Sequence, residues 1–220
     1  MIMIFLGALA FIAITSGVKV VYGRYSPNCS SLWGFKFDAR IAWLIQECPS
    51  FFIALSNYLD SDYRCAQSRV NTILISLFLF HYFHRSFIFS LLIRGGKPTP
   101  LVPFLMAFFF CVCNGYIQSR VLTHLKIYED DYLASPPFLL GIGLFFLGMG
   151  TNMHSDAILR GLRSGPVDTG YKIPRGGLFE LVSAANLFGE VLEWGGFALA
   201  SGHLPALAFF LFTLCNLVPR

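Results

Sequence analysis

The sequence carries little charge. Charged residues make up 13% of its 220 residues and hydrophobic residues 55%, with a mean hydropathy of +0.64. A soluble domain of ordinary composition has about 25% charged residues. The formal net charge of +4 includes no basic run, so the sequence gives no sign of a nucleic-acid partner. The scarcity of charge excludes an ordinary soluble domain and indicates an integral membrane protein.

The short motifs of several enzyme classes are missing as well. The sequence has no GxGxxG, P-loop or HExxH pattern, which excludes a Rossmann dinucleotide domain, and no serine elbow. Its six cysteines form no CxxC pair. Cys111 and Cys113 would lie about 200° apart around a helix, so we reject a metal site there. The chain also lacks the internal repeat that transporters usually have.

Long apolar stretches dominate what is present. A membrane-spanning helix needs about 20 apolar residues, and helices are expected because lipid cannot satisfy an open backbone. Seven stretches are long enough or nearly so, at roughly 1–21, 41–59, 70–93, 101–118, 137–159, 178–200 and 204–218. The sequence therefore predicts an all-α membrane protein, a bundle of seven transmembrane helices forming one domain over residues 1–220.

The distribution of basic residues predicts how the bundle is oriented. The first apolar stretch has no basic residue before it and Lys19 after it, the opposite of a cleaved signal peptide. Connections one, three and five hold ten basic residues and the other connections four, which places the former in the cytosol. The N-terminus is then luminal and the C-terminus cytosolic. The sequon at Asn28 should stay unmodified in this orientation.

Polar residues inside the second and third stretches are candidates for function. Glu47 lies two residues before Pro49, which removes a helical hydrogen bond beside a carboxyl that is costly in lipid. Tyr82 can donate a proton to a developing oxyanion, and Arg85 lies about 13 Å of helix from Arg94. The alternatives are an interhelical hydrogen bond for Glu47 and an interfacial belt for Tyr82 and Arg85.

Two further polar stripes flank a basic loop. In the fifth stretch, Asn152, Asp156, Arg160 and Arg163 are spaced by four, four and three residues and share a face. This stripe suits a ligand with a phosphate, which arginine binds through two N–H groups. An internal ion pair between Asp156 and Arg160 is the alternative.

The sixth stretch and the loop before it complete this region. Ser183, Asn186, Glu190 and Glu193 are predicted to form one stripe of the sixth helix. The loop 171–177 contains two glycines that allow a close approach of backbone to a ligand. Tyr171, Lys172 and Arg175 of this loop are candidates for contact with a cofactor, the two basic ones by neutralising its phosphates.

At these residues the chain resembles the steroid 5α-reductase family, with a better match to its type 1 than to its type 2 members. The resemblance covers nearly the whole chain after about residue 20 and is specific because long stretches agree. The matching stretches are 46–50, 81–85, 94–98, 113–116, 154–156 and 168–180, followed by Asn186, Glu190, Glu193 and Trp194.

The resemblance implies a multi-pass enzyme of the endoplasmic reticulum membrane that reduces the Δ4 double bond of 3-oxo-Δ4 steroids with NADPH. Hydride would go to C5, and Glu47 and Tyr82 match the pair that hydrogen-bonds the C3 oxygen. A neutral carboxyl beside a tyrosine can donate into that oxygen in a site of low dielectric constant. The candidate cofactor-binding residues are Arg85, Lys97, Asn152, Asp156, Arg160, Arg163, Tyr171, Arg175, Asn186 and Glu190.

One departure from the family concerns the C-terminus. The family pattern continues beyond the seventh apolar stretch with a cytosolic tail, so the resemblance implies a truncated form that binds cofactor poorly or is inactive. The expected partners are a steroid substrate and membrane lipid, without nucleic acid or metal, and the sequence does not predict an oligomeric state. The alternatives are a reductase of another unsaturated lipid, such as a polyprenol or an enoyl thioester, and an inactive form that binds lipid or cofactor.

Overall fold

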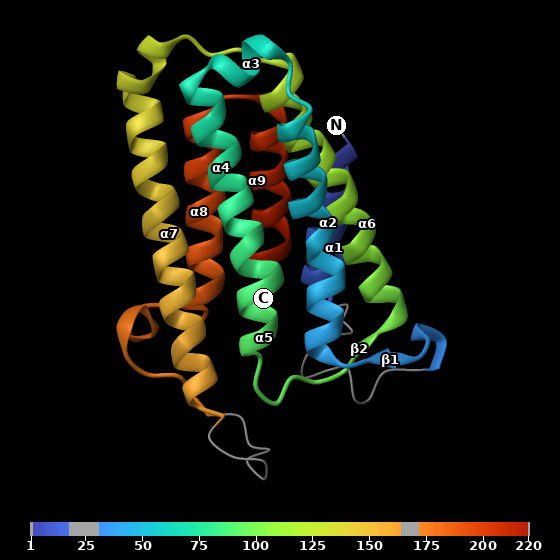
Figure 1. Ribbon diagram of the computed structural model, residues 1–220. Helices are drawn as coiled ribbons and strands as arrows, with labels where there is room; N and C mark the ends of the chain where they lie inside the picture. Colours follow the sequence, from blue (N-terminus) through green and yellow to red (C-terminus); the bar gives the residue numbers. More distant parts are fainter. Residues whose placement is uncertain (1, 18–30, 164–171, 220) are drawn as a thin grey trace. The chain divides into compact units, whose positions relative to one another are not determined.

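The computed structural model describes residues 2–17, 31–163 and 172–219, and most of them are helical (Figure 1). The chain divides into two compact units. The middle unit comprises residues 19–133, and the terminal unit comprises residues 1–18 together with 134–220. The predicted all-α class of a membrane protein agrees with this helical content and with the apolar helices described below.

The middle unit is built around three long helical stretches that lie side by side (Figure 1). Two of them contain a π-helical segment, η3 and η4, in which the backbone hydrogen bonds span one residue more than in an α-helix. Its elements are η2 (Ser31–Trp33), β1 (Lys36–Phe37), α2 (Ala39–Leu59), α3 (Tyr63–Gln67), α4 (Arg69–Phe83), η3 (His84–Phe89), α5 (Ser90–Leu92), β2 (Thr99–Pro100), α6 (Leu101–Arg120), η4 (Val121–Leu125) and η5 (Asp130–Ala134).

Short polar side chains determine where these helices begin. The Asp38 carboxylate accepts from the backbone N–H groups of Arg40 and Ile41 at 2.9 and 3.3 Å, and the Ser68 hydroxyl caps α4. Near the start of α2, β1 pairs antiparallel with β2, with Phe37 opposite Thr99. Beyond the other end of α2, Asn71 binds the carbonyls of Leu122 and Lys126 at 2.6 Å each, which ties α4 to the end of η4.

The terminal unit consists of α1 (Ile2–Thr15), α7 (Pro136–Gly161), η6 (Gly177–Glu180), α8 (Ala185–Ser201) and α9 (Leu204–Leu217). In Figure 1, α7 and α8 run side by side over most of their length, and α9 follows α8 through a tight turn at Gly202, whose φ is 54°. The core of this unit centres on Trp194, which is 1% exposed and packs against the rings of Phe145, Phe197 and Phe209.

Helices account for all seven predicted stretches, but the bounds of three differ clearly from the prediction. The first helix ends at Thr15, and residues 18–21 of that predicted stretch lie outside the described residues. The fourth helical stretch continues to Leu125, beyond the predicted residue 118. The sixth begins at Ala185 and not at residue 178, because 177–180 form a 3₁₀ turn in which Glu180 binds the Gly176 N–H at 2.7 Å. Ser183 therefore precedes α8, so the predicted helical stripe starts at Asn186.

Three helical stretches in the described ranges are long and apolar enough to cross a membrane: Arg69–Leu92, Leu101–Leu125 and Pro136–Gly161. Residues 3–15 and 204–217 form shorter apolar helices.

Candidate active site

In the middle unit, Glu47 of α2 and Tyr82 of α4 both contact side chains of a third helix, α6. The Cys111 thiol donates to Glu47 Oε2 at 3.5 Å, and Asn114 Nδ2 donates to the Tyr82 hydroxyl oxygen at 3.0 Å. Glu47, Tyr82 and Cys111 are also close enough to interact electrostatically. Tyr82 is 3% exposed and Glu47 is half-buried. We call these four residues the acid–phenol cluster.

Pro49 does not interrupt the helix that carries Glu47. The helix α2 is continuous from Ala39 to Leu59, although Pro49 has no N–H group to donate to the carbonyl of Ile45. The Cys48 thiol donates to that carbonyl at 3.4 Å. A side chain next to the candidate acid thus offsets part of the hydrogen bond that the proline removes.

Close packing of α2 on α6 holds the cluster together. A Cβ atom on Gly115 would lie 2.7 Å from the Cα atom of Ser50, so only glycine allows this approach. The Ser50 hydroxyl donates to the carbonyl of Cys111 at 2.9 Å. One turn or more further along, Asn57 Nδ2 donates to the Ser119 hydroxyl at 2.7 Å. These contacts fix the register between the two helices that carry Glu47 and Cys111.

The candidate cofactor-binding cations of the middle unit occupy different environments. Arg85 lies in the π-helical segment η3, with its guanidinium carbon 4.6 Å from the Trp43 ring centroid and 4.3 Å from that of Phe89. These contacts use the face of the guanidinium, whereas phosphate binding uses the N–H groups in its plane, so both are compatible. Lys97 is exposed on the connection before β2.

The predicted stripes of α7 and α8 meet in the terminal unit. Asn152 Nδ2 donates to the backbone carbonyl of Asn186 at 2.9 Å, and Asn186 Nδ2 donates to Asp156 Oδ1 at 3.2 Å. Asn152 and Asp156 are 7% and 5% exposed. We call these three residues the amide–carboxylate network. The Asp156 carboxylate is therefore oriented by a residue of α8. The alternative predicted from the sequence, an ion pair with Arg160, would have involved α7 alone.

Two pairs of glycines bring α7 and α8 into backbone contact beside this network. A Cβ atom on Gly148 would lie 2.3 Å from the backbone nitrogen of Glu193, and one on Gly189 would lie 2.5 Å from that of Asn152. Seven residues away on each helix, Gly141 and Gly196 make equally close approaches to each other's helix. Small residues at helix interfaces let the backbones of membrane helices approach closely. These glycine pairs set the register in which Asn152 faces Asn186.

The other predicted residues of the terminal unit lie near the same end of the two helices. Arg160 is half-buried at the end of α7, and Arg163 follows it and is exposed. Glu190 is half-buried on α8, one turn after Asn186. Tyr171 lies outside the described residues.

The basic loop is held by contacts within the terminal unit. Arg175 Nη1 lies 3.7 Å from Glu180 Oε2, and both side chains are more than half exposed. A Cβ atom on Gly177 would lie 2.6 Å from Cε1 of His154. Gly176 and Gly177 have φ angles of 92° and 55°, a backbone region that favours glycine. The glycines predicted to admit a ligand thus also let the loop pass close to α7.

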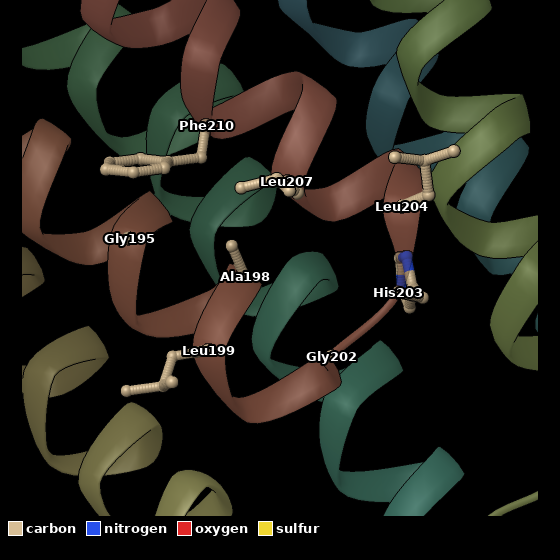
Figure 2. Close-up of a pocket in the computed structure, with 8 residues that line it drawn as sticks. All are labelled: Gly195, Ala198, Leu199, Gly202, His203, Leu204, Leu207 and Phe210. Carbon is tan, nitrogen blue, oxygen red and sulfur yellow. The ribbon is translucent and has the colours of Figure 1, made fainter.

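A groove of 570 Å³ lies elsewhere in the terminal unit, between the end of α8 and the start of α9 (Figure 2). Its lining is largely apolar and includes Leu199, Leu207 and Phe210. Asn186 stands at the first turn of α8, whereas the groove begins at Gly195. The groove is therefore separate from the amide–carboxylate network.

Sequence reasoning missed two sets of residues that support these sites. Cys111, Asn114 and Gln118 share one face of α6, and their spacing of three and four residues was a signal for it. The glycine pairs were likewise visible as two spacings of seven residues in 141–148 and 189–196. Neither pattern shows which helix lies opposite.

Comparison with known proteins gives the relationship. A family model described as 3-oxo-5-alpha-steroid 4-dehydrogenase matches residues 97–220. The chain is 48% identical to human 3-oxo-5-alpha-steroid 4-dehydrogenase 1, covering 98% of this chain and 85% of that protein. It is 50% identical to the type 1 protein of Rattus norvegicus, with 97% and 82% covered. It is 46% identical to the type 2 protein of Sus scrofa, with 96% and 81% covered.

These matches show that the chain is an oxidoreductase, and its apolar helices are typical of a membrane protein. The chain belongs to the 3-oxo-5-alpha-steroid 4-dehydrogenase family. The resemblance to steroid 5α-reductases drawn from the sequence, and the better match to type 1 members, are confirmed.

Proposed function

We propose that this chain reduces the Δ4 double bond of 3-oxo-Δ4 steroids such as testosterone and progesterone, with NADPH as the reductant. The proposal rests on family membership and on one observation, the acid–phenol cluster, in which Tyr82, Cys111 and Asn114 are buried and Glu47 is half-buried. NADPH, when bound, supplies hydride to C5 of the steroid. The chain's own residues must then stabilise the negative charge that develops on the C3 oxygen.

Tyr82 and Glu47 are suited to that task. A phenol and a neutral carboxyl group both donate hydrogen bonds, and donors aimed at a developing oxyanion lower the barrier most where water is excluded. Tyr82 is almost fully buried, so its hydroxyl acts in such surroundings. Glu47 can donate only while it is protonated, and an apolar environment favours the protonated form of a carboxyl group. The roles proposed are polarisation of the carbonyl and donation of a proton to its oxygen. The resulting enol then takes up a proton at C4 and gives back the one on oxygen, which yields the saturated ketone.

The terminal unit has donors and acceptors that fit the cofactor. The amide–carboxylate network presents buried amide and carboxylate groups, which can hydrogen-bond a carboxamide or a ribose hydroxyl. Arg160 and Arg163, at the end of the same helix, can bind phosphates. We assign Asn152, Asp156 and Asn186 to the first task. Glu190, Arg175, Lys97 and Arg85 remain candidates for further contacts.

The experiment that tests the proposal measures NADPH-dependent formation of the 5α-reduced product from testosterone and from progesterone. Membranes would contain either the 220-residue chain or the same chain followed by the C-terminal segment of the human type 1 relative. Product from either protein supports the reductase assignment, and product from the longer one alone assigns the segment a part in turnover. If neither protein forms product from a steroid while an enoyl thioester or a polyprenol is reduced, the proposed steroid substrate is wrong. Reduction of none of them favours a binding role.

We also propose that seven helices cross the endoplasmic reticulum membrane, with a luminal N-terminus and a cytosolic C-terminus. The positive charge of connections one, three and five supports this orientation. Glycosylation acceptors inserted singly into connections two and four should be modified, and those inserted into three and five should not. Glycan on an acceptor in connection three or five would invert the topology.

A further inference from the structure

A stripe of polar side chains on α6 contacts both proposed catalytic residues. Cys111, Asn114 and Gln118 are 3%, 0% and 0% exposed, although α6 is an apolar helix of membrane-spanning length. Burying three polar groups in such a helix is costly unless each is hydrogen-bonded. Cys111 contacts Glu47, and Asn114 contacts Tyr82. Helix packing alone does not account for these polar side chains, because two of them contact the proposed catalytic residues.

The hydrogen bonds of this stripe have a direction. Gln118 Nε2 donates to Asn114 Oδ1 at 3.2 Å, which fixes the oxygen of the Asn114 amide toward Gln118. Its NH₂ group is thereby turned toward Tyr82 and donates to the hydroxyl oxygen at 3.0 Å. An amide nitrogen cannot accept, so the Tyr82 hydrogen is directed away from Asn114.

Ser50 is a further side chain within hydrogen-bond reach of the Tyr82 hydroxyl, and Cys111 and Glu47 are close enough to interact with it electrostatically. The hydroxyl hydrogen of Ser50 is donated to the Cys111 carbonyl at 2.9 Å, so Ser50 can offer Tyr82 only a lone pair. Because Asn114 donates to the phenol oxygen, the phenol hydrogen is left for an acceptor other than Asn114, such as the Ser50 oxygen or the oxygen of a ligand.

We propose that Asn114 and Gln118 are positioning residues that orient the Tyr82 hydrogen toward the substrate carbonyl. The relay runs from the Gln118 amide through the Asn114 amide to the Tyr82 oxygen, and each group donates to the next. This inference rests on the proposed function, because it takes the C3 oxygen as the acceptor of the Tyr82 hydrogen. It adds two residues, neither of which touches the substrate, to the machinery of the reaction.

The test reverses the hydrogen bond between residue 114 and Tyr82 with a side chain of the same size. Asn114→Asp introduces a carboxyl group of the same size, which accepts the Tyr82 hydrogen when it is ionised and can donate as the amide did when it is protonated. Turnover of Asn114→Asp relative to wild type should therefore fall as pH rises between about 6 and 9, where buried carboxyl groups can titrate. At the upper end we expect a loss of about 100-fold, the effect of removing one oxyanion donor.

Two further variants distinguish an effect of the hydrogen-bond direction at Tyr82 from a loss of packing. Asn114→Leu removes the donor without adding an acceptor, so it should lose turnover by the same factor at every pH. Asn71→Asp is the matched control, because Asn71 is also a buried asparagine of the middle unit, but its amide binds the carbonyls of Leu122 and Lys126. Asn71→Asp should lower the amount and thermal stability of the enzyme, with turnover per folded molecule and its pH dependence unchanged.

A spectroscopic readout reports the same hydrogen bond without turnover. Testosterone labelled with ¹³C at C3 would be bound to each protein, and its carbonyl stretch measured by difference infrared spectroscopy. Wild type should lower the stretching frequency, and Asn114→Asp at high pH should lower it less. Parallel, pH-independent losses in all three variants, or an unchanged carbonyl frequency in Asn114→Asp at high pH, would overturn the relay alone. Wild-type protein that neither binds nor reduces the steroid would overturn the proposed function, and the relay with it.

Discussion

The two units hold their polar residues in different ways. In the middle unit, Gly115 lets α2 approach α6, and contacts between side chains then position the polar residues: Cys111 contacts Glu47, and Asn114 contacts Tyr82. In the terminal unit, backbone contact through glycines sets the register of α7 and α8, and the amide–carboxylate network follows from that register. A substitution in the acid–phenol cluster should therefore change chemistry more than stability, and one at the glycine contacts of α7 and α8 should change stability first.

The largest effect should come from the two residues of the middle unit proposed to touch the substrate. Glu47→Gln or Tyr82→Phe should lower steroid turnover by about 1,000-fold, within the range for a general acid. Neither change alters the volume of the side chain much, so the protein should stay folded. Turnover assays beside thermal unfolding in detergent would check both parts. Wild-type-like turnover in either variant would remove that residue from the mechanism.

Breaking the glycine contact of the terminal unit should mainly lower stability. Gly148→Ala or Gly189→Ala places a Cβ atom 2.3 or 2.5 Å from a backbone nitrogen of the other helix, so α7 and α8 must separate. We expect a loss of about 3 kcal/mol of stability, typical of severe overpacking. Thermal unfolding of the full chain measures it.

Gly150→Ala provides the control for that experiment, because a Cβ atom at Gly150 meets nothing within 4 Å among the described residues. It lies on the same helix, two residues from Gly148, and should leave stability unchanged or slightly raised, because alanine favours helix. Equal losses for Gly150→Ala and Gly148→Ala would contradict the close contact.

A smaller effect is expected at the amide–carboxylate network. Asn186→Leu removes the donor to Asp156, so the carboxylate is no longer oriented. If the network binds the cofactor, the KM for NADPH should rise by about 10-fold, the value of one hydrogen bond to a charged group. The KM for the steroid should change little. Kinetics with each substrate varied in turn would test this, and a rise confined to the steroid would reassign the network.

The smallest effect is expected in the loop. Arg175 and Glu180 form an ion pair whose side chains are mostly exposed, so Arg175→Ala should change stability by less than about 1 kcal/mol. Binding of NADPH phosphate by Arg175 would appear as a higher KM for NADPH at unchanged stability. An unchanged KM would leave Arg175 with its loop contact alone.

Particular residues show how far the sequence leads. The cost of a carboxyl group in an apolar segment was enough to select Glu47, and the four-residue spacing was enough to align Asn152 with Asp156. The start of α8 was predicted seven residues too early, because apolar residues in 178–184 look helical while the Glu180 side chain stabilises a 3₁₀ turn there. The stripe of Cys111, Asn114 and Gln118 escaped notice because the groups that Cys111 and Asn114 contact, Glu47 and Tyr82, lie on other helices.

The membrane class, the apolar helices and the residues whose burial in lipid needs a reason could be read from composition and from spacing along one helix. The family was identified by the resemblance of long stretches of sequence. The fold was needed to show that Asn114 donates to Tyr82 and that the glycines of α7 and α8 face one another. Such pairings depend on the register between helices distant in sequence, which close packing and hydrogen-bond geometry fix only once the helices are brought together.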